Sequence, residues 1–180
     1  MIRSLFVLSL IMLSACQSNR LVELDYQPDY NFQNVQSWQW AQPAIQFAPD
    51  NAENTSDLDA QRVRNAISEQ LLQQGLQHSS SGAPIQVRAW LISESQQQRT
   101  DIQQNAYWGG AWGPTIRTDS YEITQHIQKL QIDILDSSNQ QLIWRASDSW
   151  LLPQQRISPS ARDAKLREQV QHILQHFPPQ

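Results

Sequence analysis

The sequence predicts an α+β domain, with an antiparallel sheet of about four strands and two helices packed on one face. Two segments, 57–75 and 158–177, carry apolar residues at the spacing of amphipathic helices. Other segments alternate apolar and polar residues with the period of two that is typical of strands. Strands gathered between helices and joined by turns favour an antiparallel sheet covered on one side.

The composition fits one soluble domain of 180 residues. There are 13 Lys plus Arg against 17 Asp plus Glu, a formal charge of -4, so the chain has no cationic excess to neutralise phosphates. Nucleic acid is therefore not an expected partner. The polar surface is expected to be rich in neutral amides, since 29 Gln face only 2 Lys, and the 7 Trp indicate a packed core.

The first fifteen residues have the composition of a bacterial export signal. Arg3 precedes an apolar run of about nine residues, 5–13, which is signal-peptide length and too short to span ~30 Å of hydrocarbon. Leu13-Ser14-Ala15-Cys16 then resembles a bacterial lipobox. That resemblance implies removal of residues 1–15, thioether diacylation of Cys16 and acylation of its new amino group, and several acyl chains anchor a protein stably. The alternatives are a plain cleaved signal with an incidental cysteine, or an uncleaved one whose cysteine is buried.

The lipobox cysteine decides what else the mature chain can do. Cys16 is the only cysteine, so a disulfide, a thiolate metal site and a cysteine nucleophile are not expected. Under enterobacterial-type sorting, Gln17 in place of aspartate points to the outer membrane, with the domain facing the periplasm. We expect residues 16–30 to be the lipidated cysteine and a tether of at most ~50 Å. Residues 31–180 are expected to form a single periplasmic domain.

The expected strands follow from β-prone composition and alternation. A first strand over 35–40 ends before Pro43, and residues 41–56, rich in Pro, Asn and Asp, indicate a loop. A second strand covers 85–92. Segment 121–134 has apolar residues at odd positions in its first half and at even positions in its second, which predicts a β-bulge or a break near Gln128-Lys129.

A hairpin and two helices complete the pattern. Residues 136–139 form a turn between segment 121–134 and an alternating strand over 142–149. The first helix has Ser56 or Asp57 as its N-cap and Gly75 as the left-handed residue after its C-terminus. The second helix begins at Ser158-Pro159, with proline in the first turn, and ends before the terminal proline pair.

The segment 107–114 stands apart in composition, because it holds three aromatic residues and three glycines in eight positions. Glycine lets the backbone approach a ligand closely, and Trp and Tyr supply rigid contact area. Tyr107, Trp108 and Trp112 are therefore candidate partner-binding residues. The alternative is a loop that folds its aromatic side chains over an open end of the core.

No set of residues in the sequence predicts catalysis, a metal or a cofactor. His172 and His176 lie one helical turn apart, but two ligands are fewer than a stable zinc site uses. Asp133 and Asp136 are expected on opposite faces of their strand, so they do not form an acid–base pair, and Asp136 is expected to cap the turn. No Gly-x-Ser-x-Gly, Ser-x-x-Lys or Gly-x-Gly-x-x-Gly motif occurs.

Arg145 is expected on the sheet face opposite Trp144. There it is either a plain surface charge or a partner of Glu94, Asp119 or Glu122 on neighbouring strands.

The order of these features resembles a family of envelope lipoproteins known as domain of unknown function 4136. The resembling pieces span nearly the whole mature chain; they are the lipobox at Cys16, Ser37-Trp38-Gln39-Trp40, the helix from Asp57 ending at Gly75, the loop 107–114, the strand 130–136, Leu142-Ile143-Trp144-Arg145-Ala146 and Phe177-Pro178-Pro179. Ala146 stands where the family pattern usually has glycine. The resemblance implies an anchored α+β domain with no established activity.

The expected function is that of a non-enzymatic binding or accessory module of the envelope. Its partners would be the membrane, through the lipid anchor, and an envelope protein or glycan met by the open sheet face and the loop 107–114. The alternatives are an enzyme acting on envelope polymers or lipids and a carrier of a small apolar ligand.

Overall fold

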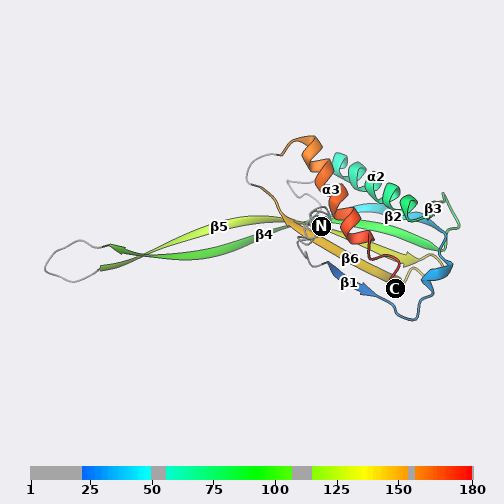
Figure 1. Ribbon diagram of the computed structural model, residues 1–180, viewed down its shortest axis with the longest axis horizontal. Coiled ribbons are helices and arrows are strands. Elements are labelled where there is room, and N and C mark those ends of the chain that lie inside the picture. The colour runs from blue at the N-terminus through cyan, green and yellow to red at the C-terminus, as the bar shows by residue number, and fades with distance from the viewer. Residues whose placement is uncertain (1–21, 50–55, 107–114, 154–156, 180) are drawn as a thin grey trace, which may run out of the picture.

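Figure 1 shows two helices lying over one face of a sheet from which a long hairpin projects. The computed structural model describes residues 22–49, 56–106, 115–153 and 157–179. Within these residues the elements are β1 (Glu23–Tyr26), the 3-10 helix η2 (Phe32–Asn34), β2 (Ser37–Ala48), α2 (Asp57–Gln73), β3 (Gln77–His78), β4 (Ile85–Ala106), β5 (Thr115–Asp136), β6 (Leu142–Leu151) and α3 (Pro159–Leu174).

The sheet is mixed and, in the described residues, has six strands in the order β1-β6-β5-β4-β2-β3. β1, β6, β5 and β4 are antiparallel neighbours, whereas β2 runs parallel to both β4 and β3. The α+β class is confirmed, but the expectation of about four antiparallel strands is wrong in detail. The parallel pairings arise because α2 carries the chain back along the sheet between β2 and β4. β1 and β3 have four and two residues, too few for a visible period.

The N-terminal boundary of the domain lies earlier than expected. β1 falls inside the stretch 16–30 that was expected to be a tether, and Val22 already packs against the core. Residues 22–26, which were expected to lie in the tether, therefore belong to the folded domain.

β2 continues past Pro43 to Ala48, so the prediction of a loop from residue 41 is wrong over its first half. Trp40 pairs with Val87 and Ile45 with Ala89, which leaves four residues of β2 opposite a single residue of β4. Such a bulge accommodates a proline, because a bulged residue need not donate to the sheet.

Both predicted helices are confirmed with their caps. The Ser56 hydroxyl accepts a hydrogen bond from the backbone N–H of Asp59 at 3.3 Å, and Gly75 has a φ of 88°. The Ser158 hydroxyl likewise accepts from the N–H of Ala161 at 3.2 Å, with Pro159 in the first turn.

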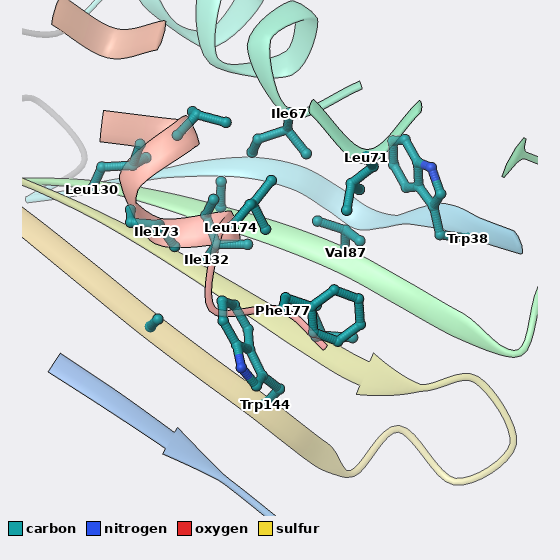
Figure 2. Packing of buried hydrophobic residues seen from close by; sticks show 14 of the residues in the cluster. Trp38, Ile67, Leu71, Val87, Leu130, Ile132, Trp144, Ile173, Leu174 and Phe177 are labelled. Atoms are coloured by element: carbon teal, nitrogen blue, oxygen red, sulfur yellow. The ribbon is translucent and has the colours of Figure 1, made fainter. Parts of the chain in front are cut away.

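The core lies between these helices and the sheet (Figure 2). Ile67 of α2 and Ile173 of α3 pack in one cluster with Val87, Ile132 and Trp144 of the sheet, and all five side chains are buried.

The pairing of β4 with β5 is continuous from Ile85 opposite Asp136 to Ala106 opposite Thr115. The predicted bulge near Gln128-Lys129 is therefore wrong. Leu130 faces the helices and is fully buried, whereas Ile127 occupies the opposite face, away from α2 and α3. The change from odd to even apolar positions marks the point where the strand leaves the helix-covered sheet.

Beyond this point β4 and β5 form an arm, defined as 93–106 and 115–126. β2 pairs with β4 only as far as Ile92, and β6 pairs with β5 only from Ile127 onward, so among the described strands those of the arm pair with each other. At the base of the arm, the Leu152 backbone N–H also donates to the carbonyl of His126 at 2.7 Å. The arm spans about 45 Å at the usual rise per strand residue. The loop 107–114, with Tyr107, Trp108 and Trp112, lies outside the described residues, so its predicted role stays a prediction.

Candidate partner-binding surface

None of the described helices covers the sheet face opposite α2 and α3, and we call it the open face. Its residues follow from the register in cross-strand rows. One row runs from Asp25 through Arg145 and Asp133 to Arg88. The next row runs through Glu23, Ser147, Gln131 and Trp90.

Asp133 is the centre of the first row, and its side chain is only 4% exposed. Arg145 forms a bidentate pair with it, with Nε 2.7 Å from Oδ1 and Nη2 2.8 Å from Oδ2. The Trp90 indole donates to Oδ2 at 3.1 Å and the Gln131 amide to Oδ1 at 3.0 Å. These hydrogen bonds join three neighbouring strands through one carboxylate.

The pairing corrects the expectation for Arg145. Its carboxylate partner is Asp133, directly opposite on β5, and not Glu94, Asp119 or Glu122. The hydrogen bonds to Asp133 raise the pKa of the Arg145 guanidinium above its ordinary value. Because donors occupy both oxygens of Asp133, this carboxylate organises the face and is poorly suited to act as a general base.

A second charged group ties the edge strand to the sheet. Lys129 Nζ donates to Glu23 Oε2 at 2.5 Å, and the Ser147 hydroxyl donates to the same oxygen at 2.9 Å. The hydrogen bond with Lys129, and after it the one with Ser147, lowers the pKa of Glu23 below its ordinary value. β1, β6 and β5 are thus linked through their side chains as well as through their backbones.

The open face becomes apolar toward the base of the arm. Trp90, Ile92 and Ile127 are half-buried there, and the Leu151 side chain is 57% exposed. Trp and Arg side chains on a rigid surface are the residue types that most often dominate the energy of an interface.

Two hollows in the described part of the chain are small. One, of about 270 Å³, lies beside β1 and is lined by Asp25, Tyr26, Gln27, Leu142, Ile143 and Trp144. The other, of about 210 Å³, lies between α2 and α3, where Glu69 and Arg167 form an ion pair across its lining. Both volumes are below the ~300 Å³ that ligand pockets usually exceed.

The four histidines lie at three separate places in the fold. His172 and His176 have ring centroids 6.3 Å apart, and His172 Nδ1 lies 3.6 Å from an Asp148 oxygen. His78 packs on the Trp38 ring, and His126 lies beside Ser95 in the arm. Among the residues with described positions, no group of three His, Cys, Asp or Glu is arranged to hold a metal ion.

Asp136 has the role expected for it. Its Oδ1 accepts from the Ser138 backbone N–H at 2.7 Å and from the Ser138 hydroxyl, which lowers the pKa of Asp136.

The central part played by Asp133 in the open face was missed from the sequence. One signal was present, since Asp133 is a charged residue between Ile132 and Ile134, in the middle of a strand whose opposite face is core. A carboxylate at the middle of such a strand needs partners on adjacent strands. Which strands are adjacent depends on the sheet order.

A family model described as a domain of unknown function (DUF4136) matches residues 22–179. A DUF4136 family protein from Bacteroides thetaiotaomicron has a similar structure, with a TM-score of 0.52 and 16% identity over 90% of this chain and 97% of that one. A PDZ domain protein from Parabacteroides distasonis has a TM-score of 0.50 and 12% identity over 88% of this chain. This chain covers only 35% of that protein. A chain of a PelC dodecamer from Paraburkholderia phytofirmans has a TM-score of 0.48 and 11% identity, over 86% of this chain and 94% of that one. No curated protein matches the chain in sequence. Likeness at these identities shows the fold alone.

Proposed function

The chain belongs to the DUF4136 family, whose domain has no known function, and from that premise we propose that it is a lipid-anchored envelope protein that binds a partner without catalysing a reaction. The partner would be a protein or a glycan of the envelope. The observation that carries this proposal is the open face, an uncovered and internally hydrogen-bonded sheet surface that presents Trp90 and Arg145.

The anchor would be the lipidated Cys16, with Gln17 directing the protein to the outer membrane and the domain facing the periplasm. The family match begins at Val22, six residues after this cysteine, so the folded domain follows the lipobox closely. In the described residues, no helix is long and apolar enough to cross a membrane.

Binding is better supported than catalysis or carriage of a small ligand. Two carboxylates of the open face are already engaged by donors, Asp133 with three side chains and Glu23 with two. An apolar carrier needs a hollow between helices and sheet, and that space is filled by buried side chains.

Cell fractionation of Cys16→Ser tests the anchor. The variant should leave the membrane fraction, because acyl chains at ~0.8 kcal/mol per buried methylene would be the attachment. Quantitative retention in the membrane after a high-salt wash would contradict the proposal. A Gln17→Asp variant, which keeps the lipidation signal, tests the outer-membrane assignment and should move the protein to the inner membrane in an enterobacterial host.

Affinity capture from detergent-solubilised envelopes tests binding. Trp90→Ala should lose captured partner relative to wild type, whereas Leu72→Ala on α2, a side chain 57% exposed on the helix layer, should not. Equal capture by both variants would remove the open face from the proposal.

The double variant Trp108→Ala/Trp112→Ala tests the loop in the same assay. If these side chains recognise a partner, capture falls while the Tm hardly changes. A Tm lowered by several degrees would instead assign them to the core.

A further inference from the structure

The exposed apolar side chains of the described residues are not scattered evenly. Six large hydrophobic side chains are exposed there, and four of them, Leu24, Tyr26, Leu142 and Leu151, lie along one edge of the sheet. β1 forms this edge beside residues 144–147 of β6, and the last residues of β6, up to Leu151, continue it toward the arm. The remaining two, Leu58 and Leu72, belong to α2. We call the row formed by Leu24, Tyr26, Leu142 and Leu151 the β1 edge.

The β1 edge is also where the chain enters the domain. Val22 immediately precedes β1, and only the stretch from Cys16 to Val22 separates it from the lipobox cysteine. Six residues reach ~20 Å at full extension. A lipid on Cys16 would therefore hold this edge close to the bilayer.

From these observations we infer that the β1 edge of the sheet rests on the lipid bilayer, an inference that depends on the lipid anchor of the proposed function. Leucine and tyrosine side chains suit the boundary between headgroups and acyl chains. An edge strand with exposed apolar residues is otherwise a site of unwanted pairing, which contact with the headgroups would cover.

Charge along the edge is compatible with a lipid surface. Glu23 is paired with Lys129, and Arg145 lies opposite Asp25 on β1 and pairs with Asp133. The acidic residues of the edge therefore have cations beside them, so they oppose contact with phosphate headgroups less than unpaired carboxylates would.

This placement sets the direction of the arm. The arm continues the direction of the strands (Figure 1), and a sheet resting on its edge has its strands parallel to the membrane. β5 is the third strand from the edge, so the arm would run about 10 Å above β1, at two strand spacings. The open face then stands upright beside the membrane and stays accessible to a partner, as does the arm.

Two other orientations of the arm are disfavoured, one by the polarity of the arm's backbone and the other by the length of the tether. An arm pointed into the bilayer would drive a two-stranded ribbon with unpaired edges into hydrocarbon, where its backbone groups would have no partners. An arm pointed straight away would lift Val22 from the surface by the length of β6 from Leu142 to Ser147, and by the turn that precedes β6, which would need nearly the whole extended tether.

Site-directed fluorescence on the full lipidated protein tests the inference. Because Cys16 is the only cysteine and lipidation consumes its thiol, one introduced cysteine labels one site with an environment-sensitive dye. The probes are Leu24→Cys and Leu151→Cys on the edge, and Leu72→Cys on α2, whose 57% exposure equals that of Leu151. The protein is reconstituted into phosphatidylethanolamine–phosphatidylglycerol vesicles that contain a spin-labelled lipid.

The edge dyes should shift their emission to the blue and be quenched several-fold more strongly by the spin-labelled lipid than the dye at Leu72. Equal quenching at all three sites, or stronger quenching at Leu72, overturns the inference. Edge dyes that are shielded without lipid quenching also overturn it, because another copy or a protein would then cover the edge. Flotation separates this failure from that of the anchor: labelled protein that fails to float with the vesicles contradicts the proposed anchor, whereas protein that floats without edge quenching contradicts only the inferred orientation.

Discussion

Asp133 shows how one side chain can organise a surface. It accepts hydrogen bonds from Trp90, Gln131 and Arg145, which come from three adjacent strands. Its side chain is almost fully buried while that of Arg145 is 43% exposed, so the carboxylate depends on its partners more than the guanidinium does.

Asp133→Asn should lower the free energy of unfolding by about 1–3 kcal/mol, because an amide directs donors toward the guanidinium and leaves buried polar groups unsatisfied. Urea unfolding measures the loss. Asp25→Asn is the control in the same row; Asp25 is exposed, and its replacement should cost less than about 0.5 kcal/mol. Equal effects of the two variants would contradict the role given to Asp133.

Glu23 gives a residue-level prediction in pH. Hydrogen bonds with Lys129 and Ser147 lower its pKa in the folded state below the ordinary 4.5. The stability it contributes is therefore complete well above pH 4.5 and is lost as the pH falls through the lowered folded-state pKa. The difference in urea midpoint between wild type and Glu23→Gln should shrink as the pH falls from about 6 to about 3. A difference that stays constant, or grows, over that range would show that the pair does not stabilise the fold.

At the scale of elements, the helices and the sheet are held together by fully buried side chains of moderate size. Ile132→Ala should lower the free energy of unfolding by ~2–5 kcal/mol, because it removes buried methyl groups and leaves a cavity under α2 and α3. Leu72→Ala on the exposed side of α2 is the control and should cost less than about 1 kcal/mol. A loss below that value for Ile132→Ala would be inconsistent with its complete burial.

The elements also differ in how well local pattern predicts them. Both helices could be predicted with their caps at Ser56 and Ser158, because capping depends on residues three positions apart. β2 was predicted too short, because Pro43 normally ends a strand and its bulge depends on β4. Of the arm, residues 121–126 were predicted as part of a strand. Residues 93–106 and 115–120 were not, because their mostly polar sequence lacks the alternation imposed by a buried face.

At the scale of the whole molecule, the arm is an extension whose removal should leave the domain intact. Replacing residues 97–124 with Asn-Gly joins Gln96 to Gln125, which are directly opposite in the register, through a turn that suits a hairpin. The free energy of unfolding should change by less than about 1 kcal/mol, because these pairs lie beyond the helix-covered core. Loss of cooperative unfolding in urea would show that the arm stabilises the domain.

The same shortened protein separates the two binding surfaces of the proposed function. If the arm carries recognition, capture of an envelope partner is lost while membrane flotation is kept. If the open face alone binds, capture persists in the shortened protein and is lost in Trp90→Ala.

The sequence by itself determined the α+β class, the two capped helices, the β5–β6 hairpin and the family, because these depend on periodicities and short motifs within single segments. The expected lipid site at Cys16 is of the same local kind. Tertiary structure alone decided the parallel position of β2, the length of the arm, the pairing of Arg145 with Asp133 and the apolar row at the β1 edge. These features depend on which distant segments become neighbours and in what register, and cross-strand hydrogen bonds set that register through backbone groups that every residue shares.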